Sequence, residues 1–499
     1  MNSVITQEST SHEQVKLCLE NMRIGDHVLS SYTKYCDLLS TRIRFADQLT
    51  ICCNTDNFYN YASPMIPYMD TAEETINNFF KKRNQIIDEL NYKCPVTDLS
   101  KPCFSCSRLK YIDSACDNIQ KITSVVIACY PSICQAKCIY CFVTKNPTYT
   151  KILAEQSKLP KLISEMIQYL EKNSYLAKNC IFIVLPAEIT VTPHKNLLLD
   201  AVSNYCSVFF TNAFHFELKI ADSMKKNGSM LKVSMDSGTK ETFRVVKGKD
   251  QFEATIKNLK RYREYDTFDK MKLKYIVIPG VNDSDHDYDG IINILHTLNM
   301  SNLQLSFDSY MPFRSVFYSF IKLISMLKDS GLTFSLADNV HNTEQINECY
   351  NHFICSNEKT KRAYKQKRDL LQKAFWNEFQ NNYDEFRVYV YEKCLAELIN
   401  YFSDNSRFLV MGQSKNKRVS AALKKINIPT EAVTEKTLVE VYNSVKKKVD
   451  ILLIPDRKLY LNLKAHVVSE KGSSLYLISI DEYFLSLDPT EVFLHRILQ

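Results

Sequence analysis

The feature that most restricts the fold of this chain is a regular alternation of short apolar runs and helical segments between residues 121 and 340. Six runs have the length and composition of buried strands, and a seventh is possible: Ser124–Tyr130, Cys180–Leu185, Cys206–Thr211, Leu231–Asp236, Leu273–Ile278, Leu303–Asp308 and Leu332–Leu336. Helical patterns separate them, including Lys161–Leu170, Glu241–Tyr265, Tyr288–Leu298 and Ser315–Lys328. Strands separated by helices pair in parallel through right-handed crossovers. We therefore predict an α/β fold built on a partial (β/α)6 barrel.

The rest of the chain predicts three further regions beside the barrel at 121–340. Residues 1–120 form a helical, cysteine-rich region, with a clear helix at Thr71–Leu90 and a β-like piece at Arg42–Cys53. Residues 341–405 form a helical linker. Residues 406–499 form a small Rossmann-like α/β domain. Its predicted strands are Phe408–Met411, Val449–Ile454 and Leu475–Ile480, and its predicted helices are Asn416–Lys425 and Glu435–Val445.

Composition excludes several classes of protein. The chain has 499 residues, of which 45% are apolar and 24% charged, as in soluble globular proteins. Its net charge of +7 is too small and too dispersed to predict nucleic-acid binding. The polar N-terminal stretch lacks a signal-peptide pattern, and no run of about 18 apolar residues predicts a membrane span. We expect a cytoplasmic protein whose 17 cysteines are reduced thiols or metal ligands.

Three of these cysteines are grouped directly after the first predicted strand. Cys134, Cys138 and Cys141 have the spacing C-x3-C-x2-C, in C-Q-A-K-C-I-Y-C. Three thiolates this close together can hold three irons of a [4Fe–4S] cube and leave the fourth iron open. A structural zinc ion would normally require four protein ligands. The spacing therefore indicates a catalytic cluster, with three unrelated cysteines as the alternative.

Polar residues also stand at the ends of the later strands. In barrels of this type the chemistry lies at the carboxyl ends of the strands. The residues found there are Glu188, Asn212, Ser234, Asp236, Asn282, Asp283 and Asp308. Turns favour Asn, Asp and Ser for local reasons, so turn chemistry alone is the alternative to a shared site.

Three stretches of the chain resemble a known family. The cysteine motif, the segment K-V-S-M-D-S-G-T-K-E-T-F-R-V-V-K-G and the segment K-Y-I-V-I-P-G-V-N-D are similar to radical S-adenosylmethionine (SAM) enzymes over roughly residues 120–340. The resemblance implies that Cys134, Cys138 and Cys141 bind the cluster. It also implies SAM contacts for five residues: the backbone of Tyr140 at the adenine amino group, Glu188 at the methionine amino group, Ser234 and Asp236 near the ribose and carboxylate, and Ile278 on the adenine.

The chain departs from the family pattern before Glu188. The family has two glycines there, and this chain has Pro186 and Ala187. Glycine allows a close backbone approach, and proline donates no N–H, so the methionine end of SAM would be held differently.

The family resemblance implies reductive cleavage of SAM followed by abstraction of a substrate hydrogen, with a flavodoxin- or ferredoxin-like electron donor as partner. The substrate class stays open between a peptide or protein and a carbohydrate-related molecule. Two alternatives are a catalytically degenerate protein that uses the same fold for binding or as a scaffold, and a zinc-binding protein.

A second group of cysteines precedes the barrel: Cys52, Cys53, Cys94, Cys103, Cys106 and Cys116. The C-x2-C pair at Cys103 and Cys106 has a metal-binding spacing. The arrangement resembles the auxiliary-cluster (SPASM-like) modules of some radical SAM enzymes, here placed N-terminally. A second iron–sulfur cluster, a structural zinc ion and buried inert thiols all remain open.

The predicted C-terminal domain has only Gly412 where a dinucleotide-binding turn would need several glycines. Packing, dimerisation or substrate presentation is therefore the expected role of this domain.

Overall fold

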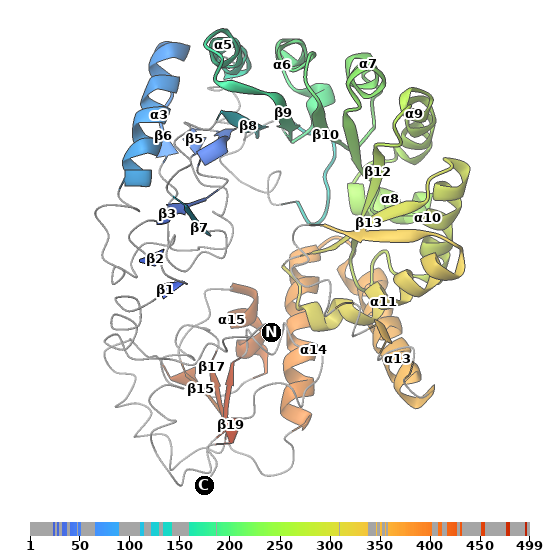
Figure 1. Cartoon of the computed structure of the whole chain (residues 1–499). Helices are drawn as coiled ribbons and strands as arrows, with labels where there is room; N and C mark the ends of the chain where they lie inside the picture. The colour runs from blue at the N-terminus through green and yellow to red at the C-terminus, as the bar shows by residue number, and fades with distance from the viewer. Residues whose placement is uncertain are drawn as a thin grey trace. The chain divides into compact units, whose positions relative to one another are not determined.

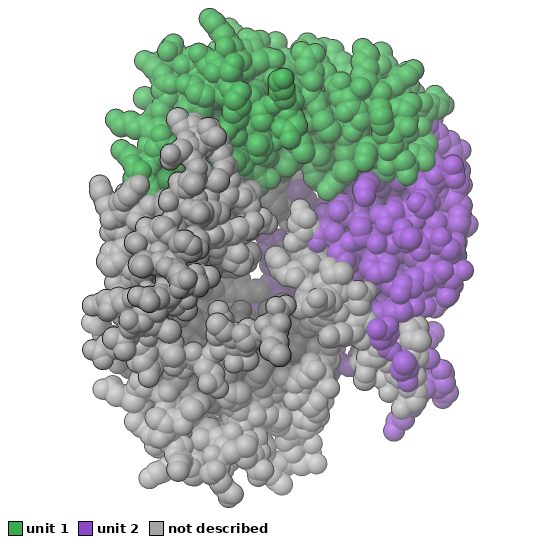
Figure 2. Space-filling view, viewed as in Figure 1, with its two compact units in different colours: residues 1–135, 142–232, 261–271 green, residues 136–141, 233–260, 272–499 purple. Residues whose placement is uncertain are grey.

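The computed structural model describes residues 23–24, 27–28, 32–36, 40–46, 48–50, 65–88, 110–113, 121–128, 133–141, 159–185, 187–308, 310–337, 346, 350–351, 355, 358–401, 408–411, 417–426, 430–431, 451–454, 476–479 and 495–496. The chain divides into two compact units (Figure 2). Unit 1 comprises residues 1–135, 142–232 and 261–271, and unit 2 comprises residues 136–141, 233–260 and 272–499.

Unit 1 contains a largely parallel run of strands. Its hydrogen-bonded order is β10 (Ser207–Thr211), β9 (Leu176–Val184), β8 (Ile122–Ile127), β4 (Arg42–Phe45), β5 (Leu49–Thr50) and β6 (Met65–Ile66). Strands β10, β9, β8 and β4 pair in parallel, whereas β5 and β6 are antiparallel additions. The sequence R-I-R-F of β4 alternates half-buried and buried side chains, as a strand with one packed face does.

Helices lie along the outer side of these strands, where α3 (Ala72–Asp88), α5 (Leu159–Lys172), α6 (Lys195–Ala201) and α7 (Leu218–Asn227) follow one another (Figure 1). Thr71 caps α3, because its hydroxyl accepts from Glu74 N at 3.1 Å and donates to the Glu74 carboxylate at 2.9 Å. Gly228 ends α7 in the left-handed conformation. The remaining short elements before residue 200 are β1 (Arg23–Ile24), β2 (His27–Val28), β3 (Tyr32–Tyr35), β7 (Lys110–Asp113) and the 3-10 turn η5 (Ile189–Val191).

Unit 2 continues the strand–helix alternation. Strands β12 (Met271–Val277), β13 (Asn302–Phe307) and β14 (Thr333–Leu336) pair in parallel, and β11 (Met230–Ser234) lies where the chain passes from unit 1 to unit 2. The helices between and after these strands are α8 (Lys240–Lys247), α9 (Phe252–Tyr265), α10 (Asp285–Thr297), α11 (Phe313–Asp329), α13 (Glu358–Ala374), the π-helical turn η6 (Phe375–Phe379) and α14 (Tyr383–Tyr401).

The C-terminal part of unit 2 is a small α/β sheet. Its strand order is β16 (Thr430–Glu431), β15 (Phe408–Met411), β17 (Ile451–Ile454), β18 (Tyr476–Ser479) and β19 (His495–Arg496). All neighbours are parallel except β18 and β19. Helix α15 (Lys417–Lys425) follows β15, and the helix predicted at Glu435–Val445 lies outside the described residues.

The predicted α/β class with parallel strands is confirmed, and two expectations about its elements need correction. Region 1–120 is not mainly helical where it is described, since α3 is accompanied by strands β1 to β7. The helix predicted at Glu241–Tyr265 is two helices, because Gly248 adopts φ 62° and ends α8. No helix among the described residues is long and apolar enough to cross a membrane.

Candidate functional site

The three motif cysteines lie on one described segment, residues 133–141. None of the three forms a disulfide, and each is partly exposed. Cys138 and Cys141 belong to unit 2 and are joined by a tight turn, in which Cys141 N donates to Cys138 O at 3.0 Å. Cys134 belongs to unit 1, where Asn212 Nδ2 lies 3.7 Å from its sulfur.

These thiols have the chemistry that a [4Fe–4S] cube requires. Soft thiolates are its usual ligands, and three of them leave one iron open. Among the residues that the structure describes, no three Cys, His, Asp or Glu side chains converge as the ligands of a single ion would. This finding concerns one-ion sites, because a cube distributes its thiolates over different irons.

The end of α8 supports the segment that carries Cys138. Lys137 N donates to Lys247 O at 2.8 Å, and Ile139 N donates to Val246 O at 3.0 Å. These carbonyls belong to the last turn of α8, where the helix leaves acceptors unused. Gly248 follows, and a Cβ there would lie 2.7 Å from Lys137 O. The absence of a side chain at this position therefore permits the close approach.

A buried polar trio lies beside this segment in unit 2. The Asp236 carboxylate is fully buried and forms an ion pair through Oδ2 with Lys247 Nζ, which is 1% exposed. Tyr140 donates its hydroxyl to the same oxygen at 2.6 Å. Burial, with Asp236 beside it, raises the pKa of Tyr140 well above its ordinary value. Burial also raises the pKa of the Cys138 thiol, whereas the Lys247 ammonium opposes that shift.

The other contacts of Asp236 connect it to the strand that follows. Its Oδ1 accepts from Ile276 N at 2.8 Å, and its main-chain oxygen accepts from Asn282 Nδ2 at 2.8 Å. Asn282 also accepts from Ile278 N at 2.7 Å, and the Ile278 side chain is fully buried. Asp236 adopts φ 56°, which is unusual for a residue with a side chain. Its carboxylate is thus engaged by protein groups on both oxygens.

Ser234 contrasts with Asp236, two residues away on the chain. It ends β11 and is partly exposed. No described residue forms a hydrogen bond with its hydroxyl. The Ser234 hydroxyl thus differs from the Asp236 carboxylate, whose two oxygens both have protein partners.

Glu188 lies in unit 1 and is fully buried. Its Oε1 accepts from Thr190 N at 3.1 Å, Thr190 Oγ1 at 2.8 Å and Thr211 Oγ1 at 2.7 Å. Its Oε2 accepts from Asn212 N at 2.7 Å. Burial raises the pKa of this carboxyl, and the four donors oppose that shift. Since each carboxylate oxygen has about two acceptor positions, Oε2 keeps one for a ligand.

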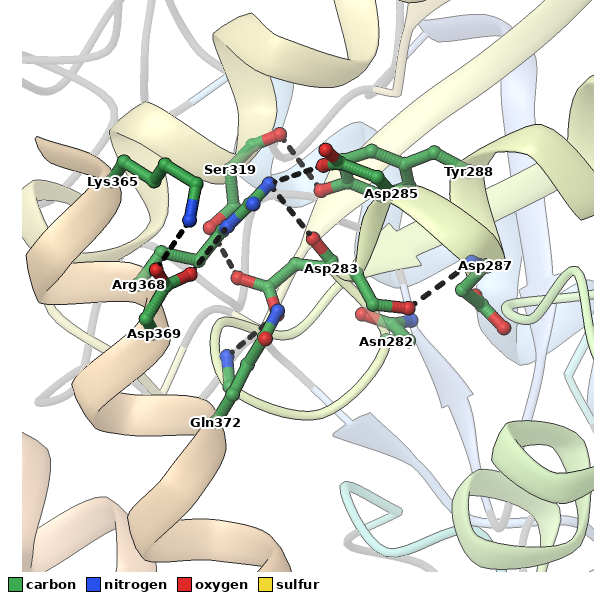
Figure 3. Close-up of polar contacts among 12 residues, drawn as sticks. Asn282, Asp283, Asp285, Asp287, Tyr288, Ser319, Lys365, Arg368, Asp369 and Gln372 are labelled. Atoms are coloured by element: carbon green, nitrogen blue, oxygen red, sulfur yellow. Dashed lines mark hydrogen bonds and ion pairs between the residues drawn. The ribbon is translucent and has the colours of Figure 1, made fainter. Parts of the chain in front are cut away.

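Two strand-end carboxylates instead bind the helices of the linker. Asp283 follows β12 and accepts from Gly280 N at 3.0 Å, Gln372 Nε2 at 2.9 Å and Ser319 Oγ at 2.5 Å (Figure 3). Asp308 follows β13 and accepts from Tyr383 Oη at 2.7 Å and from Arg387 NH2 at 2.6 Å. The expectation that all strand-end polar groups share one site therefore does not hold for Asp283 and Asp308, because α13 and α14 occupy their acceptor positions.

The auxiliary-site cysteines, Cys52, Cys53, Cys94, Cys103, Cys106 and Cys116, all lie outside the described residues. Their role stays a prediction. The sequence motifs predict no role for Lys247, although its helical spacing indicates that it is buried. Lys247 stands four residues after the buried Phe243 and so falls on the apolar face of α8.

The chain was compared with protein families and with solved structures. Residues 130–289 match the profile described as the Radical SAM superfamily. SuiB of Streptococcus suis bound to S-adenosylmethionine is similar at 15% identity and TM-score 0.32, over 54% of this chain and 57% of that chain. The structure "Native anSMEcpe with bound AdoMet" is similar at 16% identity and TM-score 0.32, over 43% and 63% of the two chains.

A radical SAM methyltransferase from Sphaerobacter thermophilus is similar at 12% identity and TM-score 0.27, over 36% of this chain and 56% of that chain. This chain thus spans a little over half the length of SuiB. TM-scores this low do not establish a common fold. No curated protein matches the chain. The profile match contains all three motif cysteines, so residues 130–289 are similar to the radical SAM superfamily domain.

Proposed function

We propose that this protein is a radical SAM enzyme. The observation that carries the proposal is the coincidence of a superfamily match at residues 130–289 with three cysteines of the C-x3-C-x2-C spacing, all free of disulfides. With the cluster and SAM bound, one electron from a flavodoxin- or ferredoxin-like donor would cleave the sulfur–C5′ bond to give methionine and a 5′-deoxyadenosyl radical, which becomes 5′-deoxyadenosine by taking a hydrogen atom from the substrate.

The chain's own residues would bind the cluster and orient SAM. Cys134, Cys138 and Cys141 would hold the cluster. The Ser234 hydroxyl would bind SAM at its ribose or carboxylate, and Glu188 Oε2 would accept from the methionine amino group. The hard chemistry belongs to the cofactor, so the protein needs no general base for hydrogen abstraction.

The remaining predicted SAM contacts are proposals of the same kind. The backbone of Tyr140 would meet the adenine amino group, and Ile278 would pack on the adenine. Asp236 would lie near the ribose and hold the residues around it in place, because its own carboxylate oxygens bind Ile276 N and Lys247 Nζ. The substrate stays open between a peptide or protein and a carbohydrate-related molecule.

One specific observation favours a second function. Pro186 and Ala187 replace the two glycines of the family pattern, and the fully buried Glu188 accepts four protein hydrogen bonds. A protein that keeps the domain for binding or as a scaffold, without cleaving SAM, would tolerate both features.

Anaerobic reconstitution with iron and sulfide tests these proposals. The parent protein and a triple Cys134→Ala, Cys138→Ala, Cys141→Ala variant would be compared for iron and zinc per chain, and for 5′-deoxyadenosine after addition of SAM and dithionite. About eight irons in the parent and about four in the variant indicate an auxiliary cluster as well, while about four and none indicate a single cluster.

Formation of 5′-deoxyadenosine by the parent alone supports the enzyme. Cysteine-dependent iron without 5′-deoxyadenosine supports the scaffold. Zinc in place of iron, or iron that does not depend on the three cysteines, refutes the radical SAM proposal.

A further inference from the structure

The Asp236–Lys247 ion pair is the most deeply buried ion pair near the motif cysteines among the described residues, with its side chains 0% and 1% exposed. Removing two charges from water is costly, and such a pair seldom adds net stability over an apolar pair of similar size. Stability alone therefore does not explain this buried ion pair. We look for its role in the groups that the two side chains contact.

The pair contacts the cysteine segment through Tyr140. The Tyr140 hydroxyl donates to Asp236 Oδ2 at 2.6 Å, and Lys247 Nζ lies 3.3 Å from the same hydroxyl. Lys247 Nζ also lies 5.8 Å from the centroid of the Tyr140 ring, within range of a cation–π contact. Tyr140 is the residue immediately before Cys141. The pair thus fixes the side chain between the last two motif cysteines.

The main chain is fixed at the same place. Lys247 O accepts from Lys137 N, so that one residue holds the segment through both its backbone and its side chain. Asp236 Oδ1 accepts from Ile276 N, which anchors the pair on β12. The left-handed conformation of Asp236 carries strain, and strained residues are retained where the surrounding structure uses their geometry.

The ammonium group also lies where negative charge would collect. Lys247 Nζ lies 3.3 Å from the hydroxyl of Tyr140, which stands between Cys138 and Cys141 in the motif. A cube bound by three thiolates is anionic, and reduction adds a further negative charge. Charge near a cluster is one of the factors that set its reduction potential.

We propose that Asp236 and Lys247 are positioning residues for the proposed cluster. They hold Tyr140 and the Cys138–Cys141 turn in the shape that binds the cube, and Lys247 supplies a fixed positive charge that favours its reduced state. This proposal rests on the proposed function, and it gives the Asp236 carboxylate a role other than contact with SAM.

Substitution of Lys247 tests the proposal. Lys247→Met keeps the aliphatic stem and removes the charge, and Lys247→Arg keeps the charge. Lys240→Met is the matched control, because Lys240 lies on the same helix and forms an exposed ion pair with Asp250 at 3.6 Å. Each protein would be reconstituted, and the loss of iron to a chelator and the reduction potential, followed by electron paramagnetic resonance, would be measured.

We expect Lys247→Met to lose iron roughly tenfold faster than the parent, as changes behind metal ligands commonly do, and to show a lower reduction potential. Lys247→Arg should keep a potential close to that of the parent, and Lys240→Met should match the parent in both measurements. Parental iron retention and potential in Lys247→Met would overturn the proposal. A parent protein that binds no iron at the three cysteines would refute the proposed function instead.

A double variant separates the charge from the folding defect that one orphaned charge would cause. Asp236→Asn/Lys247→Met leaves no unpaired buried charge, so we expect the apo protein to unfold near the parental temperature. Because the double variant removes one charge of each sign, its potential should lie above that of Lys247→Met. Equal potentials in the parent, Lys247→Met and the correctly folded double variant would show that Lys247 supplies no such charge.

Affinity for SAM in Asp236→Asn distinguishes positioning from direct contact. We expect faster loss of iron with little change in the affinity of the fully loaded protein for SAM. Weaker SAM binding with unchanged iron retention would assign the carboxylate to the ligand and overturn the positioning role.

Discussion

Asn212 connects two of the proposed functional groups of unit 1. Its backbone N–H donates to Glu188 Oε2 at 2.7 Å, and its side-chain Nδ2 lies 3.7 Å from Cys134 Sγ. The side-chain oxygen is held by Phe214 N at 3.0 Å and Gln135 Nε2 at 3.3 Å, which orients the amide nitrogen toward the sulfur. One residue therefore contacts both the carboxylate proposed for SAM and a cysteine proposed for the cluster.

Substitution of this side chain should change the cluster and leave Glu188 in place. Asn212→Leu removes the N–H···S contact but keeps the backbone donor to Glu188. Hydrogen bonds to cluster sulfurs raise the reduction potential, so the potential of the variant should fall. A redox titration of the reconstituted protein measures this, with the exposed Asn173→Leu as control. Equal potentials in the parent and Asn212→Leu would show that the amide does not act on the cluster.

At the scale of elements, the break between α8 and α9 sets the position of the cysteine segment. Gly248 ends α8 at φ 62°, and its missing side chain leaves room for Lys137. The sequence pattern alone predicted one helix here, because the apolar positions of the two helices continue in nearly the same period. A single glycine inside such a pattern does not predict that a segment distant in the sequence will pack against it.

Gly248→Ala should therefore destabilise the protein in two ways. The positive φ costs about 1–2 kcal/mol, and the new Cβ would collide with Lys137 O. Gly331→Ala is a matched control, because Gly331 has φ 73° and open space around its Cα. We expect a larger fall in the thermal midpoint for Gly248→Ala, and a loss of iron loading in that variant only. Equal behaviour of the two variants would mean that the contact with Lys137 contributes nothing.

The order of strands and helices could be predicted from the sequence, whereas the contacts of individual side chains could not. The described strands between residues 121 and 340 start and end within a few residues of the predicted runs, since buried strands need unbroken apolar stretches. The cysteine spacing likewise indicated the superfamily that the profile match supports. The contacts of the strand-end carboxylates could not be predicted, because Asp283 and Asp308 bind side chains about 80 residues or more downstream. Local sequence patterns do not predict hydrogen-bond partners so far away in the chain.

At the scale of the whole molecule, a chain of contacts within unit 2 runs from the strands to the C-terminal sheet. Asp308 after β13 pairs with Arg387 of α14, and both side chains are nearly fully buried. Asp384 of α14 pairs with Arg418 of α15 at 3.0 Å in an exposed position. Helix α14 is therefore held at the strand ends by a buried pair and at α15 by a surface pair.

These two pairs should differ greatly in their effect on stability. Arg387→Met leaves a buried carboxylate without its partner, which costs about 3–5 kcal/mol. Arg418→Met breaks an exposed pair and should cost about 1 kcal/mol or less. Thermal unfolding of both variants measures the difference. Similar midpoints would indicate that the Asp308 site relaxes and admits water when Arg387 is lost.

The parallel pairing of β4 with β8 affects how the cysteine-rich region is joined to the rest of unit 1. Arg42–Phe45 and Ile122–Ile127 are neighbours in one sheet, so the chain between residues 45 and 122 is joined to the same sheet at both of its ends. A deletion ending after residue 45 would release one end of this loop and expose the backbone edge of β8 to pairing with other chains. The strand that precedes the second set of cysteines in the sequence thus pairs directly with the strand that leads into the first set.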